Sequence, residues 1–158
     1  MSKPSARKPT TITSGYETST RRIAVAALLV AIGIVWIAVY VNLAKDAAQY
    51  TPGLGGKKPA DPLPWMSDLE RWNYLIGFLL IFAGLAVSAH KLTPLGRGRG
   101  VVVGMLGCFL LGLAWICTFY IFSNDLSKIW VFDDLDQKNL VVGIAFMAVG
   151  FSYATRWE

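Results

Sequence analysis

Charged side chains are absent from four long stretches of this 158-residue chain. The uncharged runs are Ile23–Ala44, Trp72–Ala89, Val101–Asn124 and Asn139–Thr155. Transporters that couple their substrate to an ion usually bind that ion through a carboxylate inside a membrane-spanning segment. Because none of the runs holds such a residue, the sequence argues against coupled transport, and a passive pore has no positive support.

Histidine and cysteine are scarce in the whole chain, which has one histidine and two cysteines. His90 is the single histidine, so it gives neither a metal cluster nor a catalytic triad and is expected to be an interfacial anchor. Cys108 and Cys117 would face opposite sides of one helix, and without a Cys-x-x-Cys motif a thiol oxidoreductase is disfavoured. We expect two buried free thiols that pack as small groups. The sequence predicts a protein that is not an enzyme and uses no cofactor and no metal.

The four runs are suited to a bilayer. The chain is 54% hydrophobic, and its mean hydropathy is +0.48. A hydrocarbon core about 30 Å thick needs roughly 20 apolar residues per helix, and the runs contain 22, 18, 24 and 17 residues. Backbone groups in lipid must bond within their own segment, which favours helices, and the first run is too long for a cleaved signal peptide. We predict an all-α membrane protein with four transmembrane helices.

The runs repeat each other in pairs. Residues 33–37 (GIVWI) resemble residues 112–116 (GLAWI), 79 positions later. The second and fourth runs share five positions at a spacing of 66, namely Asp68/Asp134, Leu69/Leu135, Asn73/Asn139, Gly77/Gly143 and Gly84/Gly150. An internal repeat indicates one structural unit used twice. We predict two helical hairpins that cross the membrane in the same direction, as parallel repeats.

The repeat divides the chain into four parts. Residues 1–22 form a polar, basic tail that we expect to be disordered. Residues 23–92 form the first hairpin, with a Pro- and Gly-rich outer loop over residues 45–66. Residues 93–100 form a short cytoplasmic link, and residues 101–158 form the second hairpin.

The basic residues predict an orientation. By the positive-inside rule, both chain ends and the link lie in the cytoplasm, and both longer loops lie outside. The residues that carry this prediction are Lys3, Arg7, Lys8, Arg21, Arg22, Lys91, Arg97 and Arg99. The tail could serve topology alone, or it could also bind anionic lipid or an acidic partner. It is short and rich in Ser and Thr rather than a folded basic face, so we expect no nucleic-acid partner.

Polar residues before the second run predict where its helix begins. Ser67 and Glu70 have capping-box spacing, so the helix is expected to begin at Ser67. Asp133 and Asp136 occupy the matching positions of the second copy as a weaker form of the same signal. The carboxylate pairs at these sites, Asp68/Glu70 and Asp134/Asp136, are explained by the helix starts.

Small and aromatic residues mark the helix faces. Small residues let helices approach closely in lipid, and they recur on one face of each returning helix: Gly77, Gly84 and Ser88, then Gly143, Gly150 and Ala154. These faces either pack the hairpin internally or dock partner helices. An aromatic ridge also recurs, as Trp36/Tyr40 and Trp115/Phe119, and could be core or a ridge toward a partner. The other tryptophans fall near the membrane interfaces and are expected to be anchors: Trp65, Trp72, Trp130 and Trp157.

These features together resemble a known family. A basic tail, a Gly-x-x-Trp helix, a Pro-rich outer loop, then residues 65–74 (WMSDLERWNY) with Gly84 downstream are similar to the CrgA family. Those are small actinobacterial membrane proteins of cell division, or septation. The ending Thr155-Arg156-Trp157 resembles the family's C-terminus. Family members typically have one hairpin and this chain has two, so it would imitate a homodimer of single hairpins.

The resemblance implies a divisome adaptor in the bacterial plasma membrane, enriched at the septum. Its implied partners are a tubulin-like ring protein, bitopic division proteins, septal penicillin-binding proteins and membrane lipids, with no small-molecule substrate. The residues carried over are Trp65, Trp72, Asn73, Tyr74 and Gly84, with Asn139, Gly150 and Trp157 from the second copy. The second copy has Lys138 and Leu140 where the first has Trp72 and Tyr74. The rivals are a small pore or exporter and a divergent protein with an unrelated envelope role.

Overall fold

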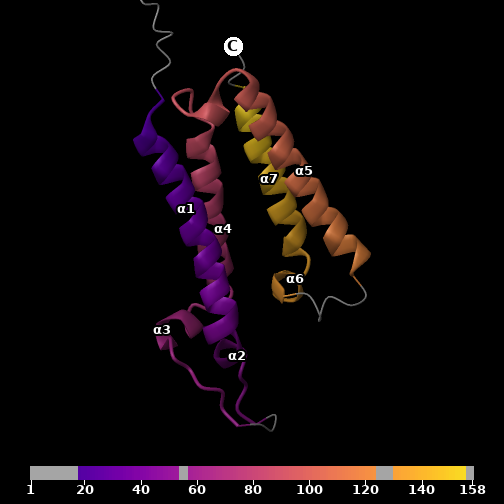
Figure 1. The fold of residues 1–158 in the computed structure, drawn as a ribbon. Coiled ribbons are helices and arrows are strands. Elements are labelled where there is room, and N and C mark those ends of the chain that lie inside the picture. Colours follow the sequence, from indigo (N-terminus) through magenta and orange to yellow (C-terminus); the bar gives the residue numbers. More distant parts are fainter. Residues whose placement is uncertain (1–17, 54–56, 124–129, 156–158) are drawn as a thin grey trace, which may run out of the picture.

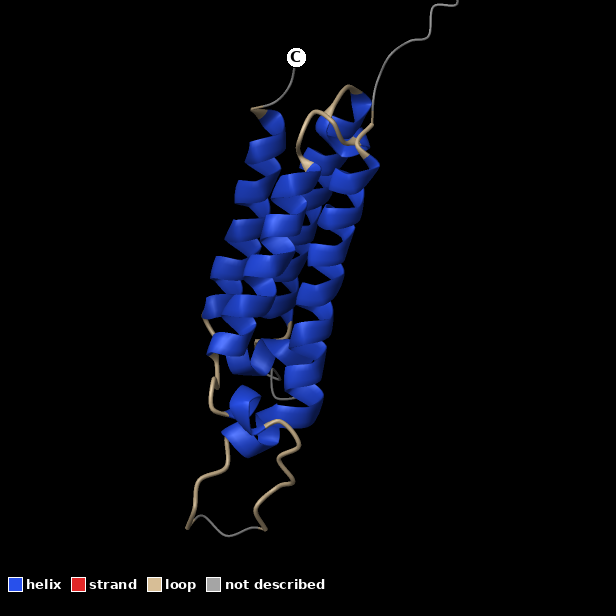
Figure 2. Ribbon diagram, turned by 90° about the vertical axis from the view of Figure 1, so that its left-hand side faces the viewer, coloured by secondary structure: helices blue, strands red, loops and turns tan. Residues whose placement is uncertain are grey.

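The computed structural model describes residues 18–53, 57–123 and 130–155, and these residues form helices and turns without a strand (Figure 2). The first run becomes α1 (Thr20–Val39), which passes through one π-helical turn (Tyr40–Ala44) into α2 (Lys45–Ala48). The returning helix is α4 (Trp72–Ser88), preceded by the short α3 (Pro64–Ser67). The second hairpin contains α5 (Arg99–Ile121), α6 (Trp130–Leu135) and α7 (Lys138–Ala154). The predicted all-α fold is confirmed.

Each long helix packs against its sequence partner, α1 with α4 and α5 with α7, and the two hairpins meet where α4 lies beside α7 (Figure 1). The continuous helix Thr20–Ala48 and α5 are 29 and 23 residues long and apolar enough to cross a membrane. At 1.5 Å per residue, the 17 residues of α4 and of α7 extend about 26 Å. Large apolar side chains cover the outside, including Leu28, Leu110 and Phe151. Such a surface suits contact with lipid and fits a helical membrane protein.

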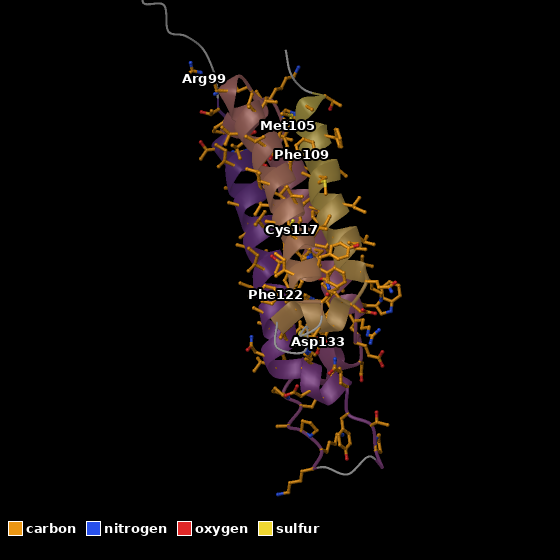
Figure 3. The ribbon with its side chains drawn as sticks, turned by 90° about the vertical axis from the view of Figure 1, so that its right-hand side faces the viewer. Arg99, Met105, Phe109, Cys117, Phe122 and Asp133 are labelled. Carbon is orange, nitrogen blue, oxygen red and sulfur yellow. The ribbon has the colours of Figure 1, made fainter. Side chains whose placement is uncertain are left out.

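The start of α1, the link and the end of α7 all lie at one end of the bundle (Figure 1). A backbone hydrogen bond from Ser19 N–H to Leu92 O (3.0 Å) ties the first helix to the link, which contains a 3₁₀ turn over Pro94–Gly96. Arg99 lies at this end, and Asp133 lies at the other (Figure 3). The predicted basic segments that the structure describes therefore share one end. We refer to it as the basic end and to the opposite one as the loop end.

Glycines bring the two helices of each hairpin into backbone contact. A Cβ on Gly33 would lie 2.6 Å from Gly77 O, and a Cβ on Gly112 would lie 2.5 Å from Gly143 O. Similarly, a Cβ on Gly84 would lie 2.8 Å from Ala26 O. Real side-chain carbons do not approach backbone this closely, so the close approach of the helices depends on glycine at these positions.

The helix starts differ from the prediction. Ser67 is the last residue of α3, and its Oγ lies within hydrogen-bond distance of Asp61 Oδ2 (2.6 Å) and Pro64 O (2.9 Å), so it caps nothing in α4. Pro64, at the first turn of α3, starts a separate short helix before Ser67. The chain then breaks at Glu70, whose φ of 43° is left-handed, and α4 begins at Trp72. The predicted capping box is therefore wrong.

The second copy breaks in the same way. Asp136 has a φ of 44° between α6 and α7, so Asp133 and Asp136 do not form a helix start either. Cys108 is buried as predicted, but Cys117 is exposed on the outer face of α5 (Figure 3). The expectation of two buried thiols is therefore wrong for Cys117, which faces away from the packed side of its helix.

Candidate functional site

The two hairpins are joined at the loop end by a polar network around Asp134, the outer latch. The Tyr74 hydroxyl donates to Asp134 Oδ2 (2.5 Å), and Lys45 Nζ forms a salt bridge with the same oxygen (3.0 Å). Gln49 Nε2 donates to Oδ1 (2.7 Å). All three donors belong to the first hairpin, whereas the acceptor belongs to the second. The latch therefore joins segments 60 to 89 positions apart in the sequence.

Burial makes the outer latch depend on its partners. Only 5% of the Asp134 side chain is exposed, and a buried carboxylate without donors would be costly. Burial alone would raise the pKa of Asp134, but the hydrogen bonds from Tyr74, Lys45 and Gln49 outweigh it and hold that pKa below its ordinary value. Asp134 is therefore charged at neutral pH, and both of its carboxylate oxygens accept hydrogen bonds from the first hairpin.

Local backbone features position the latch residues. Lys45 and Gln49 come after the π-helical turn at Tyr40–Ala44, which adds a residue to the turn and so rotates both side chains around the helix axis. Tyr74 stands in the first turn of α4 and is buried against the ring of Tyr40 at 5.2 Å between centroids. Asp134 lies on α6, just before the left-handed break at Asp136.

An aromatic seam continues the contact between the hairpins toward the middle of the bundle. Phe78 of α4 meets Trp115 of α5 edge-on at 5.7 Å, and Phe82 of α4 meets Phe146 of α7 at 5.0 Å. Trp115 also stacks on Phe132 of α6 at 4.5 Å. Such pairs add to the energy of area burial, so the seam resists separation of the hairpins.

A second polar contact, the inner latch, lies toward the basic end. Tyr153 of α7 is 1% exposed, and its hydroxyl bonds with the Ser88 hydroxyl and donates to Leu85 O (3.1 Å). Thr93 Oγ1 in turn bonds to the carbonyls of Ser88 and His90 and accepts from Gly96 N–H (3.2 Å). The link is thus fixed at the point where the second hairpin contacts the first.

Asn73 and Asn139 hold the breaks that precede α4 and α7. Both are 0% exposed. Asn73 Nδ2 donates to Met66 O (2.7 Å) and Glu70 O (2.9 Å), and Asn139 Nδ2 donates to Phe132 O and Asp136 O (both 2.8 Å). Each amide therefore clamps the carbonyl of a left-handed acidic residue to the start of the next helix, in the same way in both copies.

Replacing Asn73 with alanine is expected to cost about 1–3 kcal/mol, because the buried bond to Met66 O is lost and Glu70 O loses one of its two donors. Thermal unfolding of the purified protein in detergent measures this loss. The matched control is Asn42→Ala, since Asn42 Nδ2 also donates to a carbonyl, Ala38 O (2.7 Å), but on an exposed helix face. An equal loss in both variants would contradict a clamp at Asn73.

Comparisons with known proteins decide the family. The family model described as "Cell division protein CrgA" matches residues 1–90 and 94–158. The chain belongs to the CrgA family. This membership gives it a role in cell division.

Individual relatives agree with the CrgA family model. The chain is 44% identical over 64 residues to a cell division protein CrgA of Streptomyces avermitilis, which covers 40% of this chain and 71% of that protein. It is 32% identical over 85 residues to a CrgA of Mycobacterium sp. strain KMS, covering 54% and 80%. No solved structure matches the chain.

Most of the residues selected from the sequence for partner or helix contacts are internal. Asn73, Tyr74 and Asn139 are buried in the clamps and the outer latch. Gly77, Gly84, Gly143 and Gly150 contact their own hairpin partner helix, so the structure favours packing over docking for these faces. Ser88 joins the inner latch. Trp36 and Trp115 pack against other rings, at 5.6 Å from Trp65 and 5.7 Å from Phe78.

The remaining residues selected from the sequence are accessible or lie outside the described residues. Trp65 and Trp72 are exposed near the loop end, as expected for interface anchors. Arg21, Arg22, Lys91, Arg97 and Arg99 lie in the described basic segments. Lys3, Arg7, Lys8 and Trp157, and the side chain of Trp130, lie outside the described residues. Within the described ranges no three His, Cys, Asp or Glu side chains gather as metal ligands.

The contact of Asp134 with Lys45 and Gln49 was not predicted from the sequence. Asp134 was explained as a helix-start residue because it matches Asp68, which is exposed. The available signal was the departure at Tyr74, which the second copy replaces with Leu140. A polar residue that is present in just one of the two copies indicates a contact that the other copy does not make.

Proposed function

We propose that this protein is a non-catalytic membrane adaptor that coordinates or restrains septum formation and septal peptidoglycan synthesis. The observation that carries the proposal is the CrgA match over both segments of the chain. A protein whose buried polar groups join its own helices, as Asp134 and Tyr153 do, supplies a rigid body for partners to bind. The proposed partners are the tubulin-like ring protein, bitopic division proteins and septal penicillin-binding proteins.

The two hairpins take the place of a homodimer in this proposal. Equivalent glycines close both hairpins, and equivalent asparagines clamp both breaks, which supports an origin by tandem duplication. Both hairpins are proposed to cross the bacterial plasma membrane with the basic end in the cytoplasm, since Arg and Lys favour that side. The tail and link then face the cytoplasmic ring, and the outer loops face the septal wall.

Partner helices are proposed to bind the outward faces of α1 and α5. Those faces carry exposed apolar side chains, among them Leu28 and Val35 on α1 and Leu106 and Leu110 on α5. The glycine faces are already filled by their own hairpins. The rival small pore or exporter is opposed by the aromatic seam, where Phe78, Phe82 and Phe146 occupy the contact between hairpins.

Imaging a fluorescent fusion in dividing cells of the native host tests the proposal. We expect accumulation at the septum, because an adaptor of the division machinery must be retained by septal partners. A fusion shown to complement a deletion strain, yet uniform in the membrane through the cell cycle, would contradict it. Substrate-dependent flux across liposomes that contain the purified protein would favour the pore or exporter instead.

A further inference from the structure

A groove of about 540 Å³ opens between α4 and α7 on the loop-end half of the bundle. Its floor is apolar and includes the buried side chains Tyr74, Phe78 and Val142. Its sides include Leu75 and Val141, which are largely exposed, so the groove opens laterally to the surrounding lipid. The volume is in the range of small-molecule sites.

Two cations from different hairpins stand at the mouth of this groove. Arg71 precedes α4 and Lys138 begins α7, and both line the groove and are exposed. The one salt bridge among the described residues joins Lys45 to Asp134. Within the described residues, neither Arg71 nor Lys138 forms a salt bridge with an acidic side chain. Glu70 also lines the mouth, so the charged residues that line the groove are two cations and one carboxylate. Trp72 beside it is 67% exposed, as suits a membrane interface.

The length of the groove distinguishes a lipid chain from a partner helix. From Arg71 to Phe82 the lining of α4 extends about 16 Å, roughly half of a 30 Å hydrocarbon core. Closer to the basic end, Tyr153 bonds with Ser88 across the two hairpins. A spanning helix needs contact over the full core, whereas an acyl chain fills one leaflet.

We infer that this groove binds an anionic phospholipid of the leaflet at the loop end. Its phosphate is held between Arg71 and Lys138, and one acyl chain lies over Phe78 and along Val141 toward Ala145. The cations supply attraction to the headgroup, and the apolar lining supplies burial of the chain. The lipid would join the hairpins where α4 and α7 leave space between them. This site is independent of the adaptor proposal.

Native mass spectrometry of the full chain in a neutral detergent tests the site. Phosphatidylglycerol and phosphatidylcholine with identical acyl chains are titrated separately. We expect one saturable phosphatidylglycerol, with phosphatidylcholine bound at least about tenfold more weakly. The double variant Arg71→Gln, Lys138→Gln should lower the affinity for phosphatidylglycerol by about the same factor.

A second variant tests the groove itself. Ala145→Phe places a ring where the acyl chain is proposed to lie and should remove the bound lipid, whereas Ala148→Phe, on the exposed face of α7, should not. Circular dichroism confirms that each variant remains helical. Equal retention of the two lipids, or retention that Ala145→Phe leaves unchanged, would overturn the inference. A protein dimer that Ala145→Phe dissociates would overturn it in favour of a second copy.

Discussion

Replacing Gly112 with leucine is expected to keep the second hairpin from closing. A Cβ at this position would lie 2.5 Å from Gly143 O, so α5 and α7 must separate along their contact. Overpacking against backbone should cost about 3 kcal/mol. We expect a strongly lowered thermal midpoint in detergent and poor accumulation in cells.

Gly107 of the same helix is the matched control. A Cβ there would meet nothing within 4 Å, so Gly107→Leu adds the same side chain without a clash. Because leucine is the better helix former by up to about 1 kcal/mol, this variant should be as stable as the parent or more so. Comparable destabilisation by both substitutions would show that side-chain bulk on α5, and not the contact with Gly143, is responsible.

Replacing Asp134 with asparagine is expected to open the hairpins at the loop end. The substitution removes the charge that pairs with Lys45, and the acceptor contacts that hold Tyr74 and Gln49 become weaker. Breaking a largely buried pair costs about 3 kcal/mol. Hydrogen–deuterium exchange should increase in peptides that cover α2 and α6 and remain unchanged in peptides from the middle of α1.

Asp68→Asn is the control, because Asp68 is the equivalent residue of the first copy and is exposed. Acid should reproduce the effect in the parent protein. The lowered pKa of Asp134 means that the outer latch contributes fully above the ordinary value of about 3.9 and is lost as the pH falls through the folded-state pKa. If Asp134→Asn were as protected as the parent, or if Asp68→Asn were equally labile, the latch would not join the hairpins.

The ranges of the long helices could be predicted from the sequence, but the backbone breaks that precede α4 and α7 could not. The run Trp72–Ala89 became α4 (Trp72–Ser88), and Asn139–Thr155 became α7 (Lys138–Ala154), because the length of an apolar run is set by the bilayer. The predicted start at Ser67 failed because a capping motif is local. It contains no information on the clamp that Asn73 forms with Met66 and Glu70.

The contacts between hairpins were the least predictable part. Asn73 and Gly77 were selected because they repeat, and repetition marks what each hairpin needs for itself. Asp134 and its donors lie far apart in the sequence and do not repeat as a set, so no periodicity links them. The repeated aromatic ridge, Trp36/Tyr40 and Trp115/Phe119, was left open as core or as a ridge toward a partner for the same reason. In the structure Trp115 packs in the contact between the hairpins.

The unequal outer latch makes the two halves of the chain complementary rather than identical. The first half contributes Tyr74 as donor, the second contributes Asp134 as acceptor, and the reciprocal pair would be Asp68 with Leu140, which cannot form a hydrogen bond. Two copies of the second half would therefore lack the tyrosine donor, whereas the first half retains both Tyr74 and, at the position of Asp134, Asp68. Once fused, the halves are free to diverge, and each chain contains its own partner at fixed stoichiometry. Assembly of this four-helix unit is then independent of how much protein the cell makes.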